Sequence, residues 1–136
     1  MIKQAVACAA LTLAAGLVVA QTKELKVGVI YDLTGPFAAG GSNASYLGTK
    51  YAIDMFNERG GAEGWKIKPV YADAQSKADV AINEYERLVN QEKVDMVMGV
   101  FSSAHCVPMA QKAEAAKKFM WANVCVASAV LKDRKS

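Results

Sequence analysis

After its first twenty residues, the chain alternates short β-branched apolar segments with longer segments that carry apolar residues at helical spacing. Short apolar runs of this kind are typical of buried parallel strands, and the longer segments are typical of the helices that connect them. The expected strands and helices are, in chain order, Leu25–Tyr31, Tyr46–Arg59, Lys66–Ala72, Ala78–Gln91, Val94–Val100, Val107–Lys118 and Phe119–Val124. This β-α-β-α-β-α-β order predicts an α/β fold, a doubly wound parallel sheet in a three-layer α/β/α arrangement.

Glycine and proline positions refine this prediction. Gly60 and Gly61 follow the first expected helix and favour a left-handed cap at its end. Pro69 lies inside the second expected strand, and because proline cannot donate to a strand ladder, that strand is expected at a sheet edge. Pro108 is expected near the first turn of the third helix, where the missing N–H costs little.

Residues 1–20 have the three parts of a secretory signal peptide: Lys3 as the charged region, the apolar run Ala5–Val19, and a cleavage region before Gln21. The apolar run is shorter than the roughly 20 residues that span a bilayer, and no second such run follows. We therefore expect export to the periplasm, cleavage, and no direct membrane insertion afterwards. Residues 21–136 are expected to form the mature part.

Composition excludes several other classes. The 136 residues are enough for one domain, and 53% of them are hydrophobic, which excludes general disorder. The formal net charge is +3, without a block of like charges, so no nucleic-acid partner is expected.

The loops after three of the expected strands share a composition that favours ligand binding. Asp32–Ser45, Phe101–Cys106 and Val124–Ala129 are rich in Gly, Ser and Ala and nearly free of charge. In parallel sheets ligands bind beyond the carboxyl ends of the strands, and the N-terminus of the following helix favours an anionic group. Ser102 and Ser103 add hydroxyl donors at such a position.

Several long stretches resemble one family. The runs KVGVIYDLTGPFAAGGSNASYLGTKYAIDMFNERGG, KPVYADAQSKADVAINEYERLVNQEKVDMVMGVFSSA and KKFMWANVC are similar to the start of the leucine/isoleucine/valine-type periplasmic binding proteins of ABC transporters. The resemblance implies the type I periplasmic binding fold, in which two similar α/β lobes are joined by a hinge. It also implies that residues 21–136 are an incomplete N-terminal lobe, and that the whole protein delivers a solute to a membrane permease.

The resemblance also implies residue roles. The loops after the third and fourth strands would contact the solute, an amino acid or amide, through Ser102, Ser103, Ala104, Val124, Cys125 and Val126. Phe37, in the first loop, would form an aromatic wall. Two alternatives stay open: Ser102 and Ser103 could cap the following helix, and Phe37 could pack within its loop. A ligand-sensing receptor domain of the same fold is the alternative function.

No enzyme, cofactor or metal site is predicted. A nucleotide-binding enzyme of the doubly wound type would need a phosphate-binding glycine motif, which the first loop lacks. It would also need an acidic residue at the end of the second strand to bind a ribose, and the nearest one, Asp73, is expected in a loop. No aspartate ends the third strand, which argues against a phospho-acceptor domain. His105 has no carboxylate near it in sequence, so we expect a helix-terminal or loop role for it.

Two cysteines, Cys106 and Cys125, remain after the expected cleavage, at spacing that is unlike a metal site. Both are expected at the carboxyl ends of neighbouring strands. Because the periplasm is oxidising, we hypothesise a disulfide between them.

Overall fold

The computed structural model describes residues 22–130, so the expected signal peptide and the last residues of the expected lobe lie outside the described part. The strands are all parallel and form one sheet in the order β2-β1-β3-β4. Their bounds are β1 Lys23–Tyr31, β2 Trp65–Asp73, β3 Met96–Gly99 and β4 Phe119–Ala122. The position of β2 at a sheet edge confirms the expectation drawn from Pro69.

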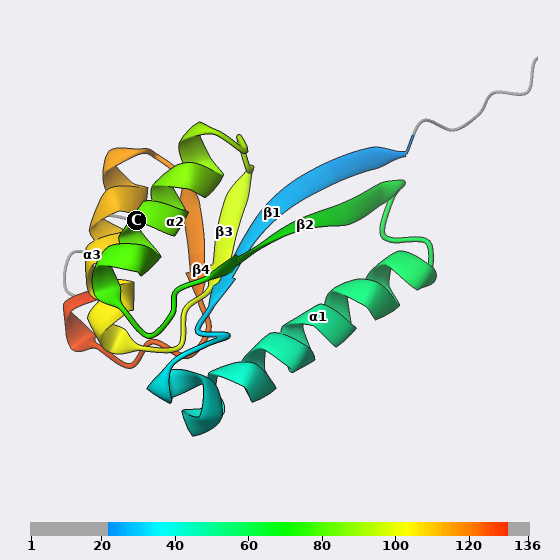
Figure 1. The fold of residues 1–136 in the computed structure, drawn as a ribbon. Helices are drawn as coiled ribbons and strands as arrows, with labels where there is room; N and C mark the ends of the chain where they lie inside the picture. Colours follow the sequence, from blue (N-terminus) through cyan, green and yellow to red (C-terminus); the bar gives the residue numbers. More distant parts are fainter. Residues whose placement is uncertain (1–21, 131–136) are drawn as a thin grey trace, which may run out of the picture.

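Helices cover both faces of this sheet, as Figure 1 shows: α1 lies on one face, and α2 and α3 lie together on the other. The helical segments are η1 Ala38–Ser42, α1 Asn43–Glu58, α2 Ala78–Asn90, α3 Ser103–Ala115 and η2 Ser128–Val130. The α/β class, the parallel sheet and the three-layer arrangement are therefore confirmed.

The end of α1 also follows the sequence signal. Gly60 and Gly61 have φ values of 93° and 76°, and the backbone N–H of Gly61 donates to the carbonyl of Phe56 at 2.9 Å. Such left-handed residues satisfy carbonyl groups that the last helical turn leaves free.

The starts of two helices were predicted wrongly. α3 begins at Ser103, four residues before the expected Val107, because Ser102 has extended φ/ψ angles and its side chain accepts the N–H of Ala104 at 3.3 Å. Pro108 therefore lies inside α3 and not near its first turn. Likewise, the expected loop Asp32–Ser45 is helical from Ala38 onward, with a kink at Gly41, whose φ is 132°.

The third and fourth strands are shorter than predicted, whereas the first and second are slightly longer. β3 covers Met96–Gly99, and β4 ends at Ala122. Cys125 thus follows β4 by a short connection, whereas Cys106 lies within α3 and not at the end of a strand, which corrects its expected place.

Side chains alternate between two core clusters, one on each face of the sheet. From β1, Ile30 packs with Leu88 and Met109 on the α2–α3 side, whereas Val29 packs with Ile53 on the α1 side. The period of two along the strand produces this division, since successive side chains point to opposite faces. The parallel pairing of β1 with β3 places the carboxyl ends of these two strands next to each other.

The α1 side of the sheet is covered only in part. A hollow of about 780 Å³ lies between α1 and the sheet, and it includes Met98, Phe119 and Trp121 in its wall. Phe119 and Trp121 of β4 are 66% and 57% exposed. Apolar side chains so exposed on one sheet face mark a surface that is suited to contact with further protein. Within residues 22–130, no helix has the length and apolar character needed to cross a membrane.

Candidate ligand-binding edge of the sheet

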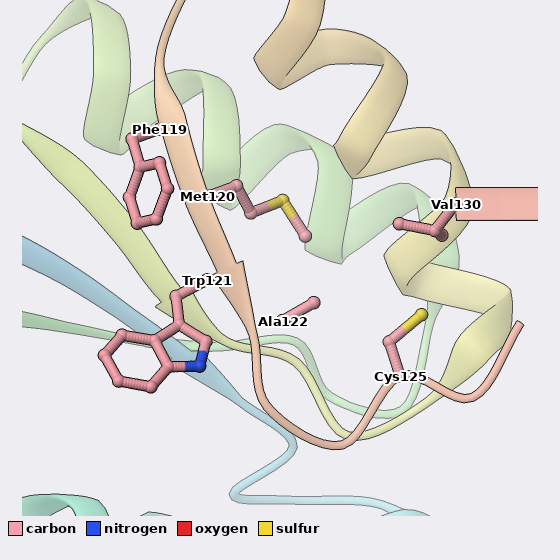
Figure 2. A pocket seen from close by; sticks show the side chains of 6 residues that line it. All are labelled: Phe119, Met120, Trp121, Ala122, Cys125 and Val130. Carbon is pink, nitrogen blue, oxygen red and sulfur yellow. The ribbon is translucent and has the colours of Figure 1, made fainter. Parts of the chain in front are cut away.

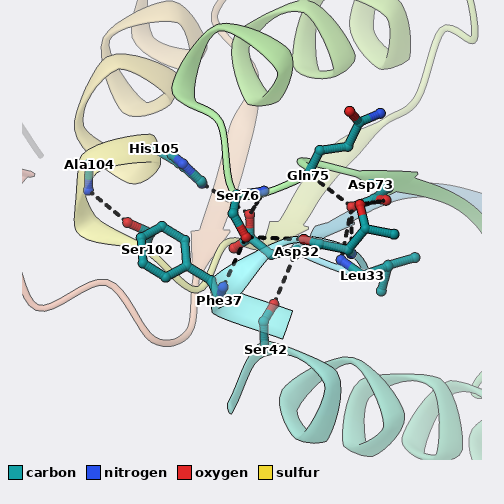
Figure 3. Close-up of polar contacts among 11 residues, drawn as sticks. Asp32, Leu33, Phe37, Ser42, Asp73, Gln75, Ser76, Ser102, Ala104 and His105 are labelled. Atoms are coloured by element: carbon teal, nitrogen blue, oxygen red, sulfur yellow. Dashed lines mark hydrogen bonds and ion pairs between the residues drawn. The ribbon is translucent and has the colours of Figure 1, made fainter. Parts of the chain in front are cut away.

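The loops after β1, β3 and β4 meet at the carboxyl edge of the sheet. Figure 3 shows residues from the loop after β1, the loop after β2 and the start of α3 joined by polar contacts. Parallel strands with alternating helices bring these loops to one edge, because every strand ends in the same direction. The sequence-predicted site loops are therefore neighbours in space.

The connection from β3 to α3 has an unusual backbone. Gly99 has a φ of 111°, and Val100 has a φ of 67°, which is rare for a β-branched residue. The N–H of Val100 donates to the carbonyl of Ile30 at 2.7 Å, and its side chain is buried in the core. Such a conformation costs about 1–3 kcal/mol and persists where the surroundings hold it, which is common at ligand sites.

The two serines at the start of α3 have different surroundings. The hydroxyl of Ser102 accepts the N–H of Ala104, so it caps the helix. The hydroxyl of Ser103 makes no hydrogen bond within the described part of the chain, and its residue is partly exposed. Ser102 therefore has the capping role that was left open, whereas the Ser103 hydroxyl has no partner among residues 22–130 and Ala104 is exposed at the helix N-terminus.

Phe37 is half-buried and packs inside the cluster. Its ring meets the ring of His105 edge to face, with 5.7 Å between the centroids. Its backbone N–H donates to the hydroxyl of Ser76 at 2.9 Å. These contacts support the loop-packing alternative, while the part of Phe37 that remains accessible leaves its role as a ligand wall a prediction.

His105 has a carboxylate partner that the sequence did not indicate. Its side chain is 3% exposed, and its Nδ1 lies 3.4 Å from Oδ1 of Asp32 at the end of β1. His105 is the third residue of α3, so it lies near the helix N-terminus as expected, but it faces inward. The signal that could have found the pair is topological, since the ends of β1 and β3 are adjacent in a sheet of this order.

Asp32 connects the loops beneath the edge. Its Oδ1 accepts the N–H of Ser76 at 2.8 Å, and its own N–H donates to the hydroxyl of Ser42 at 2.8 Å. Its Oδ2 is buried and has no hydrogen-bond partner among the described residues. Burial disfavours the charged carboxylate and raises the pKa of Asp32, although the neighbouring His105 and the Ser76 N–H oppose this rise.

Asp73 is the last residue of β2, which corrects its expected place in a loop. Its carboxylate accepts the N–H groups of Leu33 at 2.9 Å and Gln75 at 2.8 Å, and the hydroxyl of Thr34 at 2.7 Å. Burial alone would raise its pKa, but these hydrogen bonds outweigh burial and hold the pKa of Asp73 below its ordinary value. The carboxylate is thus occupied in holding the first loop and is not presented to a ribose.

Replacing Asp73 by asparagine is expected to lower the free energy of unfolding by about 1–2 kcal/mol at pH 7, because hydrogen bonds to a charged acceptor are stronger than neutral ones. The pKa of Asp73 is depressed in the folded state, so its contribution is present above the ordinary aspartate pKa and is lost as pH falls through the folded pKa. The difference between the two proteins should therefore shrink below about pH 4 in urea unfolding curves. Asp54→Asn, which removes a surface ion pair to Lys50, is the control and should change little.

The loop after β4 contains the remaining predicted ligand residues. Asn123 is held by its amide, which donates to the hydroxyl of Tyr31 at 2.7 Å. Val126 is 89% exposed, whereas Val124 and Cys125 are partly buried. The structure joins Cys125 to Cys106 by a disulfide, with Cα atoms 6.1 Å apart, inside the range that such bonds require.

The described residues hold no group of three or more His, Cys, Asp or Glu side chains that could bind a metal ion. What they place at the edge is a small, nearly neutral surface of backbone amides, serine hydroxyls and apolar side chains. Such a surface suits recognition of a small polar solute.

Comparisons with known proteins agree with this geometry. Residues 24–133 match the family described as periplasmic binding protein. The chain is 34% identical over 116 residues to the Leu/Ile/Val-binding protein homolog 7 of Brucella suis, and the aligned part covers 85% of this chain and 28% of that protein. The chain thus spans less than a third of the length of this relative.

Two solved structures are similar as well. One is the branched-chain amino acid transporter substrate binding protein LivJ from Streptococcus pneumoniae in complex with isoleucine, with a TM-score of 0.76 and 27% identity over 81% of this chain and 31% of that chain. The other is a solute binding protein of an ABC transporter from R. palustris in complex with 4-hydroxybenzoate, with a TM-score of 0.65 and 26% identity over 79% of this chain and 29% of that chain. From the match over residues 24–133, this chain belongs to the family of periplasmic binding proteins.

Proposed function

We propose that this chain forms one lobe of the extracytoplasmic solute-binding component of an ABC transporter, with the solute bound at the carboxyl edge of its sheet. The observation that carries the proposal is the N-terminus of α3, where the Ser103 hydroxyl has no hydrogen-bond partner among residues 22–130 and Ala104 is exposed, next to the loops after β1 and β4. The signal peptide expected in residues 1–20 would deliver the protein to the periplasm, and a membrane permease would be its partner. The proposed role of this chain is binding alone, and no reaction is assigned to it.

The solute class follows from chemistry that two similar proteins share. Isoleucine and 4-hydroxybenzoate, bound by the S. pneumoniae and R. palustris proteins, differ in their side groups but both carry a carboxylate. An anionic group is favoured at a helix N-terminus, where backbone N–H groups and the helix dipole face it. We therefore assign the carboxylate of an amino acid or aromatic acid to the start of α3, with Phe37 and Val124–Val126 facing the rest of the solute.

In a protein in which this lobe is followed by a second lobe, Ser103→Ala is expected to weaken solute binding by about tenfold to a hundredfold, the loss of one hydrogen bond to a charged group, without changing stability. Ser102→Ala is the matched variant next to it. Because Ser102 caps α3, this variant should lower the free energy of unfolding by about 1 kcal/mol. Calorimetry with L-isoleucine, L-leucine and 4-hydroxybenzoate, together with thermal melts, separates the two effects. Equal affinities of Ser103→Ala and the unaltered protein would contradict the assignment.

Residues 21–136 alone are expected to bind these solutes very weakly, because one lobe supplies one wall of the cleft and cannot close around the ligand. A protein in which this lobe is followed by a second lobe should bind at least one of them at micromolar or lower concentration. Micromolar binding by the single lobe in the same calorimeter would contradict the two-lobe proposal.

A further inference from the structure

The loop Asn123–Ala127, between β4 and η2, carries Val124, Cys125 and Val126 but has few contacts of its own. At its start, the N–H of Asn123 lies 3.4 Å from the carbonyl of Gly99, and at its end the carbonyl of Ala127 accepts the N–H of Val130. Between these points, no backbone hydrogen bond is made by Val124, Cys125 or Val126 among residues 22–130. Hydrogen bonding therefore holds only the two ends of this loop.

Side-chain packing around the middle of the loop is incomplete. Cys125 lines a hollow of about 450 Å³ together with Met120, Ala122 and Val130, and Figure 2 shows how these side chains lie. Val126 extends into solvent. The side chain of Cys125, in contrast, joins Cys106, which is fully buried in the core with Met109. The disulfide is thus the one strong attachment of the middle of this loop in the described structure.

Cys106, at the other end of the disulfide, lies near the start of α3. Cys106 follows His105, whose ring contacts Phe37 and whose Nδ1 faces Asp32. Both residues lie in the first turns of α3, directly after the capped N-terminus. Two consecutive residues of one helix therefore connect the start of α3 to the loop after β1 and to the loop after β4.

We propose that the Cys106–Cys125 disulfide positions the loop after β4 for solute binding, and that reducing it weakens binding while the lobe stays folded. The inference rests on the proposed function. Reduction by a dithiol breaks the S–S bond, transfers two electrons and two protons to give two cysteine thiols, and leaves the reductant as a cyclic disulfide. The freed residues then have to be ordered again whenever solute binds, which lowers affinity roughly tenfold for each residue ordered.

The test uses the two-lobe protein purified oxidised from the periplasm. Thiol titration first establishes that the cysteines are bonded. Calorimetry with L-isoleucine, L-leucine and 4-hydroxybenzoate is then performed before and after treatment with dithiothreitol, at a temperature where circular dichroism shows both forms folded. Reduction should weaken binding by about tenfold to a thousandfold, a factor of about ten for each of Val124, Cys125 and Val126 that has to be ordered, and reoxidation of the same sample should restore it. A Cys106→Ala/Cys125→Ala variant should have the affinity of the reduced protein, with or without dithiothreitol.

The outcomes separate this inference from the proposal beneath it. If the oxidised protein binds a probe and the reduced protein binds it equally well, the disulfide has only a structural role and the inference is wrong, while the proposed function stands. Two free thiols in the oxidised preparation would also overturn the inference alone. If the oxidised protein binds none of the three probes, the proposed function fails and the inference falls with it.

Discussion

Gly99→Ala is expected to lower the free energy of unfolding by about 3–5 kcal/mol, which is most of the stability of a small lobe. Gly99 ends β3 with a φ of 111°, a backbone conformation that residues with a side chain rarely adopt. A Cβ there would overlap the carbonyl oxygen of Ile30 in the neighbouring strand and would lie 3.1 Å from the Tyr31 ring. Neither neighbour can move easily, because both belong to the buried strand β1.

Gly48→Ala is the matched control for this substitution. Gly48 lies in α1 and has open space around the position of a Cβ. Alanine favours a helix over glycine by about 1 kcal/mol, so this variant should be more stable than the unaltered protein. Urea unfolding of the three proteins measures both effects. A Gly99→Ala protein within about 1 kcal/mol of the unaltered one would show that β1 and β3 are less closely packed than the structure indicates.

Substitution of Gly99 is also expected to affect the candidate site. Gly99 and Val100, both at positive φ, turn the chain from β3 toward Ser102 at the start of α3. A shift of this turn would move Ser103 and the N-terminal amides of α3 relative to the loop after β1. Solute affinity should therefore be lost in any Gly99 variant that still folds.

The strand–helix alternation was sufficient to predict the class and layers of the fold, because each period of apolar residues selects one type of element. Pro69 predicted the edge strand and Gly60–Gly61 the end of α1. Both predictions held because proline has no N–H to donate and glycine can adopt positive φ, and these are properties of the residue itself. Helix starts were less predictable. The first turn of α3 depends on the capping geometry of Ser102, and Pro108 indicated a start that the structure places earlier.

The candidate site was predictable as a set of loops but not as a set of contacts. A parallel sheet brings the loops after β1, β3 and β4 to one edge whatever their side chains. Whether His105 turns inward to Asp32, or outward to a solute, depends on side-chain rotamers and on the order of the strands, and sequence spacing carries neither. The buried Asp32–His105 pair, and the contact of Phe37 with it, were missed for that reason.

Reducing the Cys106–Cys125 disulfide is expected to lower the free energy of unfolding by about 3 kcal/mol, in addition to its effect on affinity. The two cysteines are 19 residues apart, so the bond closes a loop that includes most of α3 and all of β4. Closing such a loop removes conformations from the unfolded chain, and the unfolded state gains them back on reduction. The estimate depends only on the sequence separation, and it applies even though the lobe stays folded after reduction.

Urea unfolding with and without dithiothreitol measures this loss, and the Cys106→Ala/Cys125→Ala variant is the control for the reductant. This variant should be less stable than the reduced protein, because replacing the fully buried Cys106 by alanine also removes a sulfur atom from the core beside Met109. The order of stability should therefore be oxidised, reduced, then double alanine. Equal stability of the oxidised and reduced proteins would mean that the unfolded chain is already compact around α3 and β4, since a disulfide cannot remove freedom that the unfolded state lacks.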